Sequence, residues 1–274
     1  MRIPDWLIYA LALSVFVWAI FLADNEALDA PEPLPENLQE EGPSLPEPTV
    51  FDETVLVQVA APQDGVGSAF AIDRNGNWLT ARHVVDGCRR VSLLVAPNRY
   101  VSVAQVDIDP ASDLALLQTG RSLRAVDLKL ENDLRVGQIG YHVGYPQGRP
   151  GEVATRLLAR SRLVTRGTRR GEEPVLAWSE LGRTRGLTGS LGGLSGGPVF
   201  DAEGRARGVI VAESPRRGRI YTAAPRSIER FLERRGISPS DGRAEPITVE
   251  TYGRRADDLR KSLQVVKVAC EVDR

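Results

Sequence analysis

Histidine and cysteine are scarce in this sequence, which has two of each among its 274 residues. His83 and His142 lie far apart, and Cys88 and Cys270 do not form a pair at the short spacing of metal ligands. A glycine-rich phosphate loop of the P-loop type is also missing. The sequence therefore predicts no metal site, no phosphate-binding loop and no cofactor.

Excess charge is absent as well. The 35 Lys and Arg residues nearly balance the 36 Asp and Glu residues, for a net charge of −1 at pH 7. Bulk electrostatics therefore indicate neither a nucleic-acid partner nor an acidic surface. The hydrophobic content of 42% is that of a globular protein with a substantial core.

Charged residues are missing from the stretch 6–23, "WLIYALALSVFVWAIFLA". A helix of this length spans about 27 Å, close to the hydrocarbon thickness of a bilayer, so we expect residues 1–23 to form an N-terminal transmembrane anchor. A cleaved signal peptide has a shorter apolar core and a basic start. The small residues "ALDA" at 27–30 keep cleavage open as an alternative.

Lysine and arginine are absent between Asp24 and Asp73, where acidic residues are frequent. Because cytoplasmic flanks collect positive charge, we expect the N-terminus in the cytoplasm and the bulk of the chain outside. In a two-membrane bacterium this predicts a single-pass protein of the inner membrane whose main domain faces the periplasm. Residues 24–49 combine repeated proline with acidic side chains, which is typical of an extended linker.

Long helical patterns are absent from residues 51–221, which consist of short β-branched or apolar runs broken by turn residues. This pattern predicts an antiparallel sandwich or barrel. "DRNG" at 73–76 and "DAEG" at 201–204 predict hairpin turns. Helices are expected at 226–236 and at about 254–263. The tail from residue 237 onward is too short for a sizeable independent domain, and either packs on the main domain or hangs free.

Glycine gathers around a single hydroxyl at residues 192–198, "GGLSGGP". Glycine costs conformational entropy on folding and is useful where the backbone turns unusually or another group comes close. The run therefore presents Ser195. A catalytic serine needs a base within hydrogen-bond reach, and the base needs an acceptor that fixes its tautomer.

The candidates for these two groups are few. His83, in "WLTARHVVDGC", lies where an apolar run breaks into a turn, whereas His142 lies inside the strand-like run "IGYHVGYP". Asp113, in "DPASDLALLQT", lies where a polar turn becomes an apolar strand. Taken singly, such features are more often structural than catalytic. Their joint occurrence in the order His, Asp, Ser is what favours a catalytic site.

The segments "TARHVVDGC", "SDLALLQ" and "GLSGGPVF" resemble the three catalytic segments of the chymotrypsin-like (trypsin-fold) serine proteases, in particular the bacterial HtrA/Deg branch. Further matches are "GVGSAF" at 65–70, "VGYPQG" at 143–148 and "YTAAP" at 221–225. The resemblance thus extends from about Val55 to Arg235.

The resemblance implies a role for each of the three residues. Ser195 would be the nucleophile, His83 the general base and then acid, and Asp113 the group that orients the imidazole and stabilises its cation. The amides of Gly193 and Ser195 would form the oxyanion hole. Leu194 departs from the Asp or Asn that is commoner in relatives.

The implied fold is all-β, with two antiparallel six-stranded β-barrels, the site in the cleft between them and a C-terminal helix. The expected organisation is the anchor at 1–23, the linker at 24–49, a protease domain at 50–236 and a C-terminal extension at 237–274. The barrels would occupy about 50–130 and 131–225, with their boundary near 125–134.

The resemblance also points to a specificity pocket. The position six before the serine, acidic in trypsin, is Gly189 here. The opposite wall would be "VIVAES" at 209–214, which contributes Val211, Ala212 and Glu213. These residues imply a small or medium aliphatic side chain before the scissile bond.

Control of such a protease is left open by the sequence. HtrA proteins usually carry a PDZ domain after the protease, and we expect none here. Control would then come from ordering of the loop at 183–192, from the tail, or from a homotrimer of the kind that the family shows. Cys88 and Cys270 fall in a part predicted to face an oxidising compartment, where they form either a disulfide that ties the tail beside the loop of His83 or two free thiols.

The sequence thus predicts a membrane-anchored serine endopeptidase that hydrolyses peptide bonds of extracytoplasmic proteins through a Ser-His-Asp triad and an acyl-enzyme intermediate. The alternative is a catalytically silent or latent protease fold that acts as an anchored binding or scaffold module. The intact triad favours the enzyme, because binding alone gives no reason to keep His83, Asp113 and Ser195 together.

Overall fold

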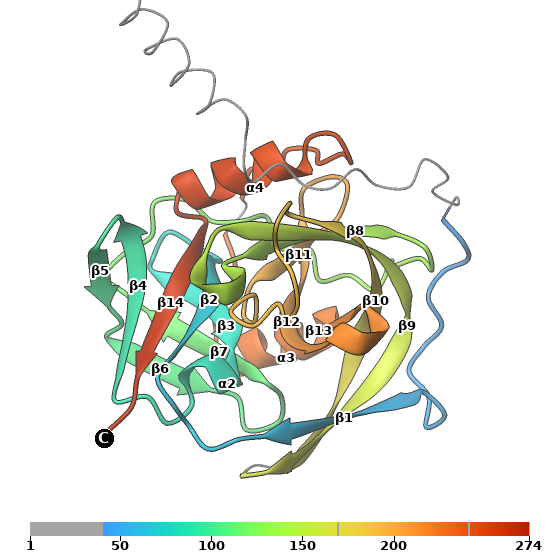
Figure 1. Ribbon diagram of the computed structural model, residues 1–274, viewed down its shortest axis with the longest axis horizontal. Coiled ribbons are helices and arrows are strands. Elements are labelled where there is room, and N and C mark those ends of the chain that lie inside the picture. The colour runs from blue at the N-terminus through green and yellow to red at the C-terminus, as the bar shows by residue number, and fades with distance from the viewer. Residues whose placement is uncertain (1–40, 169, 241, 274) are drawn as a thin grey trace, which may run out of the picture.

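Two β-sheets lie side by side, with short helices around them (Figure 1). The structure is a computed structural model that describes residues 41–168, 170–240 and 242–273. The predicted transmembrane segment and the linker up to residue 40 lie outside these residues. Within the described ranges, no helix combines the length and apolarity that crossing a membrane requires.

The first sheet has seven strands in the order β5-β4-β14-β2-β3-β7-β6. Its strands are β2 (Gly65–Ala71), β3 (Asn77–Ala81), β4 (Arg90–Ala96), β5 (Arg99–Ser102), β6 (Gln105–Ile108), β7 (Leu114–Gln118) and β14 (Val265–Glu271).

The second sheet also has seven strands, in the order β1-β9-β10-β13-β12-β11-β8. Its strands are β1 (Glu53–Val59), β8 (Ile139–Gly144), β9 (Gly151–Gly167), β10 (Gly171–Arg183), β11 (Pro198–Phe200), β12 (Ala206–Ser214) and β13 (Arg219–Ala223). An additional pairing of β8 with β9 closes all of them except β1 into a barrel. Strand β1 lies outside the ring, parallel to β9.

The prediction of a mostly β chain with two sheets is confirmed. The ring of the second sheet has the six strands that were predicted, with β1 added outside it, whereas the first sheet has seven strands instead of six. The C-terminal strand β14 is inserted between β2 and β4, and the N-terminal strand β1 joins the second sheet. Val266 and Val268 of β14 are fully buried. Apolar side chains from the end of the chain therefore complete the core of the first sheet, a long-range pairing that no local pattern indicates.

The described end of the predicted linker packs on the second sheet instead of extending away from it. Leu45 is buried, and its amide donates to the carbonyl of Leu134 at 2.7 Å. Arg160 Nε donates to the carbonyl of Pro46 at 2.5 Å. The burial of Leu45 and the hydrogen bond to the carbonyl of Pro46 outweigh the tendency of this proline-rich stretch to extend into solvent.

The helices among the described residues are short. They are α2 (Arg82–Val85), α3 (Pro225–Glu233) and α4 (Tyr252–Lys261), with 3-10 turns η1 (Pro146–Gly148) and η2 (Pro215–Arg217). Helices α3 and α4 lie close to the predicted positions, 226–236 and 254–263, and the single turn α2 forms where the sequence predicts a turn. The predicted hairpin turns also form, with Gly76 at φ +90° and Gly204 at φ +79°, conformations that favour glycine.

The tail packs on the main domain. In Figure 1, α4 lies along one side of the molecule and β14 runs into the first sheet. A disulfide joins Cys270 of β14 to Cys88, in the loop after α2. Of the two alternatives for the cysteines, the structure has the disulfide.

Candidate active site

His83 and Asp113 meet because their strands are neighbours. Strand β3 pairs antiparallel with β7, so that Ala81 lies opposite Leu114. His83 follows the end of β3, on the single turn of α2, and Asp113 directly precedes β7. The amide of Arg82 donates to the carbonyl of Asp113 at 3.0 Å and fixes this junction.

The carboxylate of Asp113 binds His83 twice. Its Oδ2 lies 2.6 Å from His83 Nδ1, and its Oδ1 accepts the backbone amide of His83 at 3.0 Å. A proton on Nδ1 that is held by the carboxylate makes Nε2 the basic nitrogen of the ring. The Asp113 side chain is 7% exposed and that of His83 is 37% exposed, so that a shielded carboxylate orients an accessible base.

Glu173 adds a contact that the sequence did not predict. It lies on β10 of the second sheet, is buried, and accepts the amide of Asp113 on its Oε1 at 2.8 Å. The second sheet therefore holds the backbone of the aspartate whose side chain orients His83. Nothing in the surrounding "GEEP" marks this contact, which depends entirely on how the two sheets meet.

Ser195 lies in the loop between β10 and β11, held on both sides. Its carbonyl accepts the amide of Ser68 in the first sheet at 2.8 Å. The next amide, that of Gly196, donates to the carbonyl of Ile210 in the second sheet at 2.8 Å. Gly196 has φ +83°, and a Cβ there would lie 2.1 Å from the carbonyl oxygen of Ser68. Only glycine fits the chain at this point.

The amides of Gly193 and Ser195 are the candidate anion site. Gly193 has φ +97°, and a Cβ there would lie 2.5 Å from the carbonyl oxygen of Tyr145. The carbonyl of Gly192 accepts the amide of Gln147 at 2.5 Å. Because the C=O and N–H of one peptide point in opposite directions, the amide of Gly193 points away from Gln147. Among the described residues, the amides of Gly193 and Ser195 donate to no protein acceptor.

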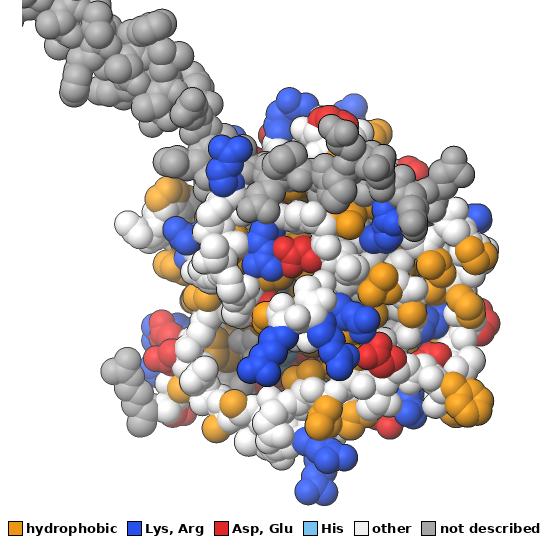
Figure 2. All heavy atoms as spheres, turned by 45° about the vertical axis from the view of Figure 1, so that its right-hand side comes forward, with side chains coloured by type: hydrophobic (Ala, Val, Ile, Leu, Met, Phe, Trp, Pro, Cys, Tyr) orange, Lys and Arg blue, Asp and Glu red, His pale blue; other side chains and the backbone are white. Residues whose placement is uncertain are grey.

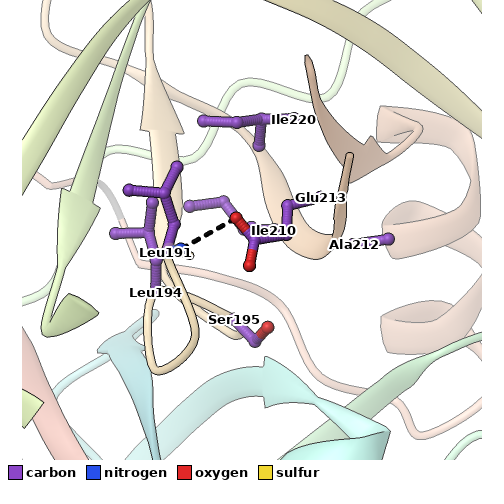
Figure 3. Close-up of a pocket in the computed structure, with 7 residues that line it drawn as sticks. All are labelled: Leu191, Leu194, Ser195, Ile210, Ala212, Glu213 and Ile220. Atoms are coloured by element: carbon purple, nitrogen blue, oxygen red, sulfur yellow. Dashed lines mark hydrogen bonds between the residues drawn. The ribbon is translucent and has the colours of Figure 1, made fainter. Parts of the chain in front are cut away.

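A pocket with about 210 Å³ of empty space, part of it open to solvent, begins beside Ser195. It is lined by Leu191, Leu194, Ser195, Ile210, Ala212, Glu213 and Ile220 (Figure 3). The Glu213 carboxylate turns back to the loop, where it accepts the amide of Leu191 at 2.8 Å and the hydroxyl of Ser190. The pocket is therefore aliphatic, with one carboxylate that is already hydrogen-bonded.

The surface view shows the approach to the site. In Figure 2 a histidine is visible at the floor of a hollow, with Lys and Arg side chains beside it. A Cβ on Gly196, the residue after Ser195, would lie 2.9 Å from the amide nitrogen of Ala81, two residues before His83. The loop of Ser195 therefore packs against the strand end that carries the histidine, an arrangement that suits attack on a carbonyl group of a bound chain.

Comparisons with known proteins agree with this geometry. A family model described as "Trypsin-like peptidase domain" matches residues 67–209, more than half of the chain. The chain belongs to the trypsin-like peptidase family.

Curated relatives of this peptidase domain include HtrA/DegP-type proteases. A stretch of 169 residues is 32% identical to Protease Do-like 5, chloroplastic, of Arabidopsis thaliana, covering 57% of this chain and 50% of that protein. Another of 161 residues is 29% identical to a probable periplasmic serine endoprotease DegP-like of Bartonella henselae, covering 57% of this chain and 30% of that protein. The chain thus spans half or less of the length of these relatives.

A solved structure shows the same fold. The HtrA-type protease AlgW with tripeptide superposes with a TM-score of 0.50 at 21% identity, covering 63% of this chain and 57% of that one. The likeness to the chymotrypsin-like fold and the HtrA branch that the sequence predicts is thereby confirmed.

The peptidase pocket contains part of the predicted specificity set. Ala212 and Glu213 line it, whereas Val211 and Gly189 do not. Val211 is buried, at a point where the register of β12 shifts between Ile210 and Ala212. Gly189 has φ +73° in an outer turn, where a Cβ would meet no atom within 4 Å. Leu191, Leu194, Ile210 and Ile220 also line the pocket and were not predicted.

The second histidine of this peptidase domain is structural. His142 is fully buried, its Nε2 lies 2.9 Å from Thr155 Oγ1, and its ring packs edge-on against Trp178. Burial lowers its pKa to about 3. A ring that is neutral and closed off from solvent cannot exchange protons with a substrate near pH 7.

Proposed function

We propose that this protein is a serine endopeptidase that works through an acyl-enzyme. The observation that carries the proposal is the 2.6 Å contact of Asp113 Oδ2 with His83 Nδ1, in a site that also holds the glycine-framed Ser195. Family membership supports it, since relatives named as serine endoproteases share the domain.

The proposed reaction uses groups of this chain alone. Ser195 Oγ attacks the carbonyl carbon of the scissile bond while His83 Nε2 takes the hydroxyl proton, and Asp113 stabilises the resulting imidazolium. The amides of Gly193 and Ser195 bind the oxygen that becomes negative. His83 then gives its proton to the leaving amine, and a water molecule, activated by the same ring, hydrolyses the ester on Ser195.

Labelling of the purified full chain with a fluorophosphonate tests this mechanism. We expect one adduct on Ser195 by mass spectrometry, and its loss in both Ser195→Ala and His83→Ala. Removal of such a nucleophile or base typically lowers turnover on the order of a million-fold, so that the contrast is large. A folded wild-type protein without an adduct would instead support the silent or latent module.

We propose an aliphatic residue before the scissile bond as the substrate preference. Five aliphatic side chains line the pocket, and both oxygens of Glu213 are occupied by Ser190 and Leu191. A peptide panel should show cleavage after small or medium aliphatic residues, with Glu213→Gln leaving that preference in place. Cleavage confined to sites after Arg or Lys, abolished by Glu213→Gln, would assign the specificity to the carboxylate instead.

We further propose that the peptidase is anchored in the bacterial inner membrane and faces the periplasm. The support is the uncharged run at 6–23 and the lack of Lys and Arg between Asp24 and Asp73. Membrane fractionation should retain the protein after an alkaline wash, and added protease should reach it in spheroplasts. Release by the wash, or protection in spheroplasts, would contradict the anchor or the orientation. Assembly of this chain into a homotrimer, which the family resemblance implies, remains a prediction.

A further inference from the structure

The turn between β8 and β9 is joined to the loop before Ser195 by one residue, Gln147. Its backbone amide donates to the carbonyl of Gly192 at 2.5 Å. Its side-chain Nε2 donates to the carbonyl of Thr188 at 2.7 Å and to that of Ser190 at 2.9 Å. One residue of η1 therefore binds three carbonyls of the segment 188–192.

The backbone of Gln147 is unusual for a residue with a side chain. Its φ is +52° and its ψ is +27°, in the left-handed region that favours glycine. Such a conformation persists where surrounding contacts over-determine it, and it is often found at functional sites. A glycine would adopt it without strain but would leave the carbonyls of Thr188 and Ser190 without this donor.

The turn that carries Gln147 is itself held firmly. The amide of Gly148 donates to the carbonyl of Tyr145 at 2.9 Å. From the C-terminal segment, Arg260 Nη1 donates to the carbonyl of Gly151 at 3.1 Å, and Lys267 Nζ to that of Gly148 at 3.3 Å. Gln147 thus acts from a fixed support on a loop that is rich in glycine.

The bond to Gly192 decides where the next amide points. If the peptide between Gly192 and Gly193 rotated by half a turn, the carbonyl of Gly192 would take the direction of the Gly193 amide, and the anion site would lose a donor. Rotation would break the bond from the Gln147 amide. The two side-chain bonds restrain the backbone at Thr188 and Ser190. This backbone would have to move if the Gly192–Gly193 peptide rotated.

We propose that Gln147 is a positioning residue that holds the Gly192–Gly193 peptide in the orientation in which both amides of the oxyanion hole face the substrate. This inference rests on the proposed peptidase function. It assigns to the "VGYPQG" segment a role in catalysis without contact with the reacting atoms.

Two variants of Gln147 and a matched control test the proposal. Gln147→Ala removes both side-chain bonds, and Gln147→Glu places a carboxylate against two carbonyl oxygens at nearly the same volume. Arg149→Ala, at an exposed position of the same turn where no side-chain contact is described, serves as the control. Because loss of one oxyanion donor lowers kcat by about 100-fold to 1,000-fold, partial misorientation should lower kcat by roughly 10-fold to 100-fold with little change in KM. Thermal unfolding midpoints should stay near that of the control.

A second measurement does not depend on activity. Hydrogen exchange of peptides covering residues 188–195 should be faster in both Gln147 variants than in the wild type and in Arg149→Ala. Exchange at control rates would overturn the proposal whatever the activity of the wild type. If the wild type is never labelled at Ser195 but exchange is faster in the variants, the peptidase function fails while the restraint on the loop stands. Faster exchange with kcat within twofold of the control would overturn the link to the oxyanion hole.

Discussion

At the scale of single residues, Ser68 ties the two sheets together at the nucleophile. It is fully buried on β2, and its Oγ donates to the carbonyl of Gly193 at 2.8 Å while accepting the amide of Tyr145 at 2.9 Å. Its own amide donates to the carbonyl of Ser195 at 2.8 Å. One small side chain therefore satisfies groups on both sides of the loop that presents the hydroxyl.

Ser68→Ala should destabilise the protein more than its size suggests. The change leaves the carbonyl of Gly193 and the amide of Tyr145 buried without their partner, at a cost of about 1–3 kcal/mol in the free energy of unfolding. Denaturant unfolding measures this loss, with Ser102→Ala, at an exposed strand end, as the control. Equal stability of the two variants would mean that water or a shift of the loop replaces the hydroxyl.

His142 should make stability dependent on pH. Burial lowers its pKa to about 3 from an ordinary value of 6.5. Between these two values the ring is protonated in the unfolded chain but neutral in the folded protein. The stabilisation is present above pH 6.5 and is lost as the pH falls toward 3. By pH 4.5 the loss from this ring is about 3 kcal/mol.

The comparison of wild type with His142→Asn isolates this contribution from that of the carboxylates. Free energies of unfolding at pH 7.5 and 4.5 should fall more steeply in the wild type, by about 3 kcal/mol. Parallel pH dependences of the two proteins would show that the ring is protonated while folded.

Among the candidate site residues, those embedded in a local pattern could be read from the sequence. The glycines around Ser195 and the break before His83 are features of short segments, as is the turn that precedes Asp113. Glu173, Gln147 and Ser68 contact the site because distant strands meet there. The sequence separation is 60 between Glu173 and Asp113 and 125 between Ser68 and Gly193. Their roles follow from three-dimensional packing, which the local sequence does not encode.

At the scale of elements, α4 is fastened to the second sheet by one buried arginine. Arg260 Nη2 lies 2.8 Å from Glu152 Oε2, with both side chains buried, and also 2.7 Å from Asp257 on its own helix. Its Nη1 reaches the carbonyl of Gly151. The helix thereby supports the two ends of β8 and β9 that carry the turn with Gln147.

Replacement of Arg260 by Met should be costly, because it leaves the carboxylate of Glu152 buried without a cation. Breaking a buried pair from one side typically costs about 3–5 kcal/mol in the free energy of unfolding. Denaturant unfolding should show this loss for Arg260→Met, and a smaller one for the double variant with Glu152→Gln. Arg254→Met, an exposed change on the same helix, serves as the control. If the double variant is no more stable than Arg260→Met, the loss comes from the packing of the Arg260 side chain and not from the unpaired carboxylate of Glu152.

The elements themselves divide by the range of their contacts. The hairpin turns at Gly76 and Gly204 and the helix α3 follow from a few neighbouring residues, and their sequences predict them. The parallel pairing of β1 with β9 and the insertion of β14 between β2 and β4 join segments from opposite parts of the chain. For that reason the sequence indicates strands there but not their partners.

At the scale of the whole molecule, the C-terminal strand makes the first sheet continuous. Strand β14 pairs with β2 along six residues from Val265 to Cys270, and with β4 on its other side. Without β14, both neighbours would present open edges, and the buried Val266 and Val268 would leave the core. His83 follows β3 and Asp113 precedes β7 of this sheet, so that the proposed base depends on the end of the chain.

Reduction of the disulfide between Cys88 and Cys270 should therefore weaken the whole first sheet. The bond closes a loop with a sequence separation of 182 residues, and loss of such a cross-link typically costs about 2–5 kcal/mol, mainly by freeing the unfolded chain. Denaturant unfolding with and without reductant measures the loss. The double variant Cys88→Ser, Cys270→Ser should have the free energy of unfolding of the reduced protein, and reductant should not change it. Because β14 keeps its ladders on both sides, the reduced protein should still fold, and Ser195 should still react with the fluorophosphonate under native conditions. If two thiols of the native protein react with an alkylating agent before any reductant is added, the disulfide is contradicted. If the reduced protein unfolds without denaturant, the hydrogen bonds of β14 to β2 and β4 are not sufficient to hold the strand.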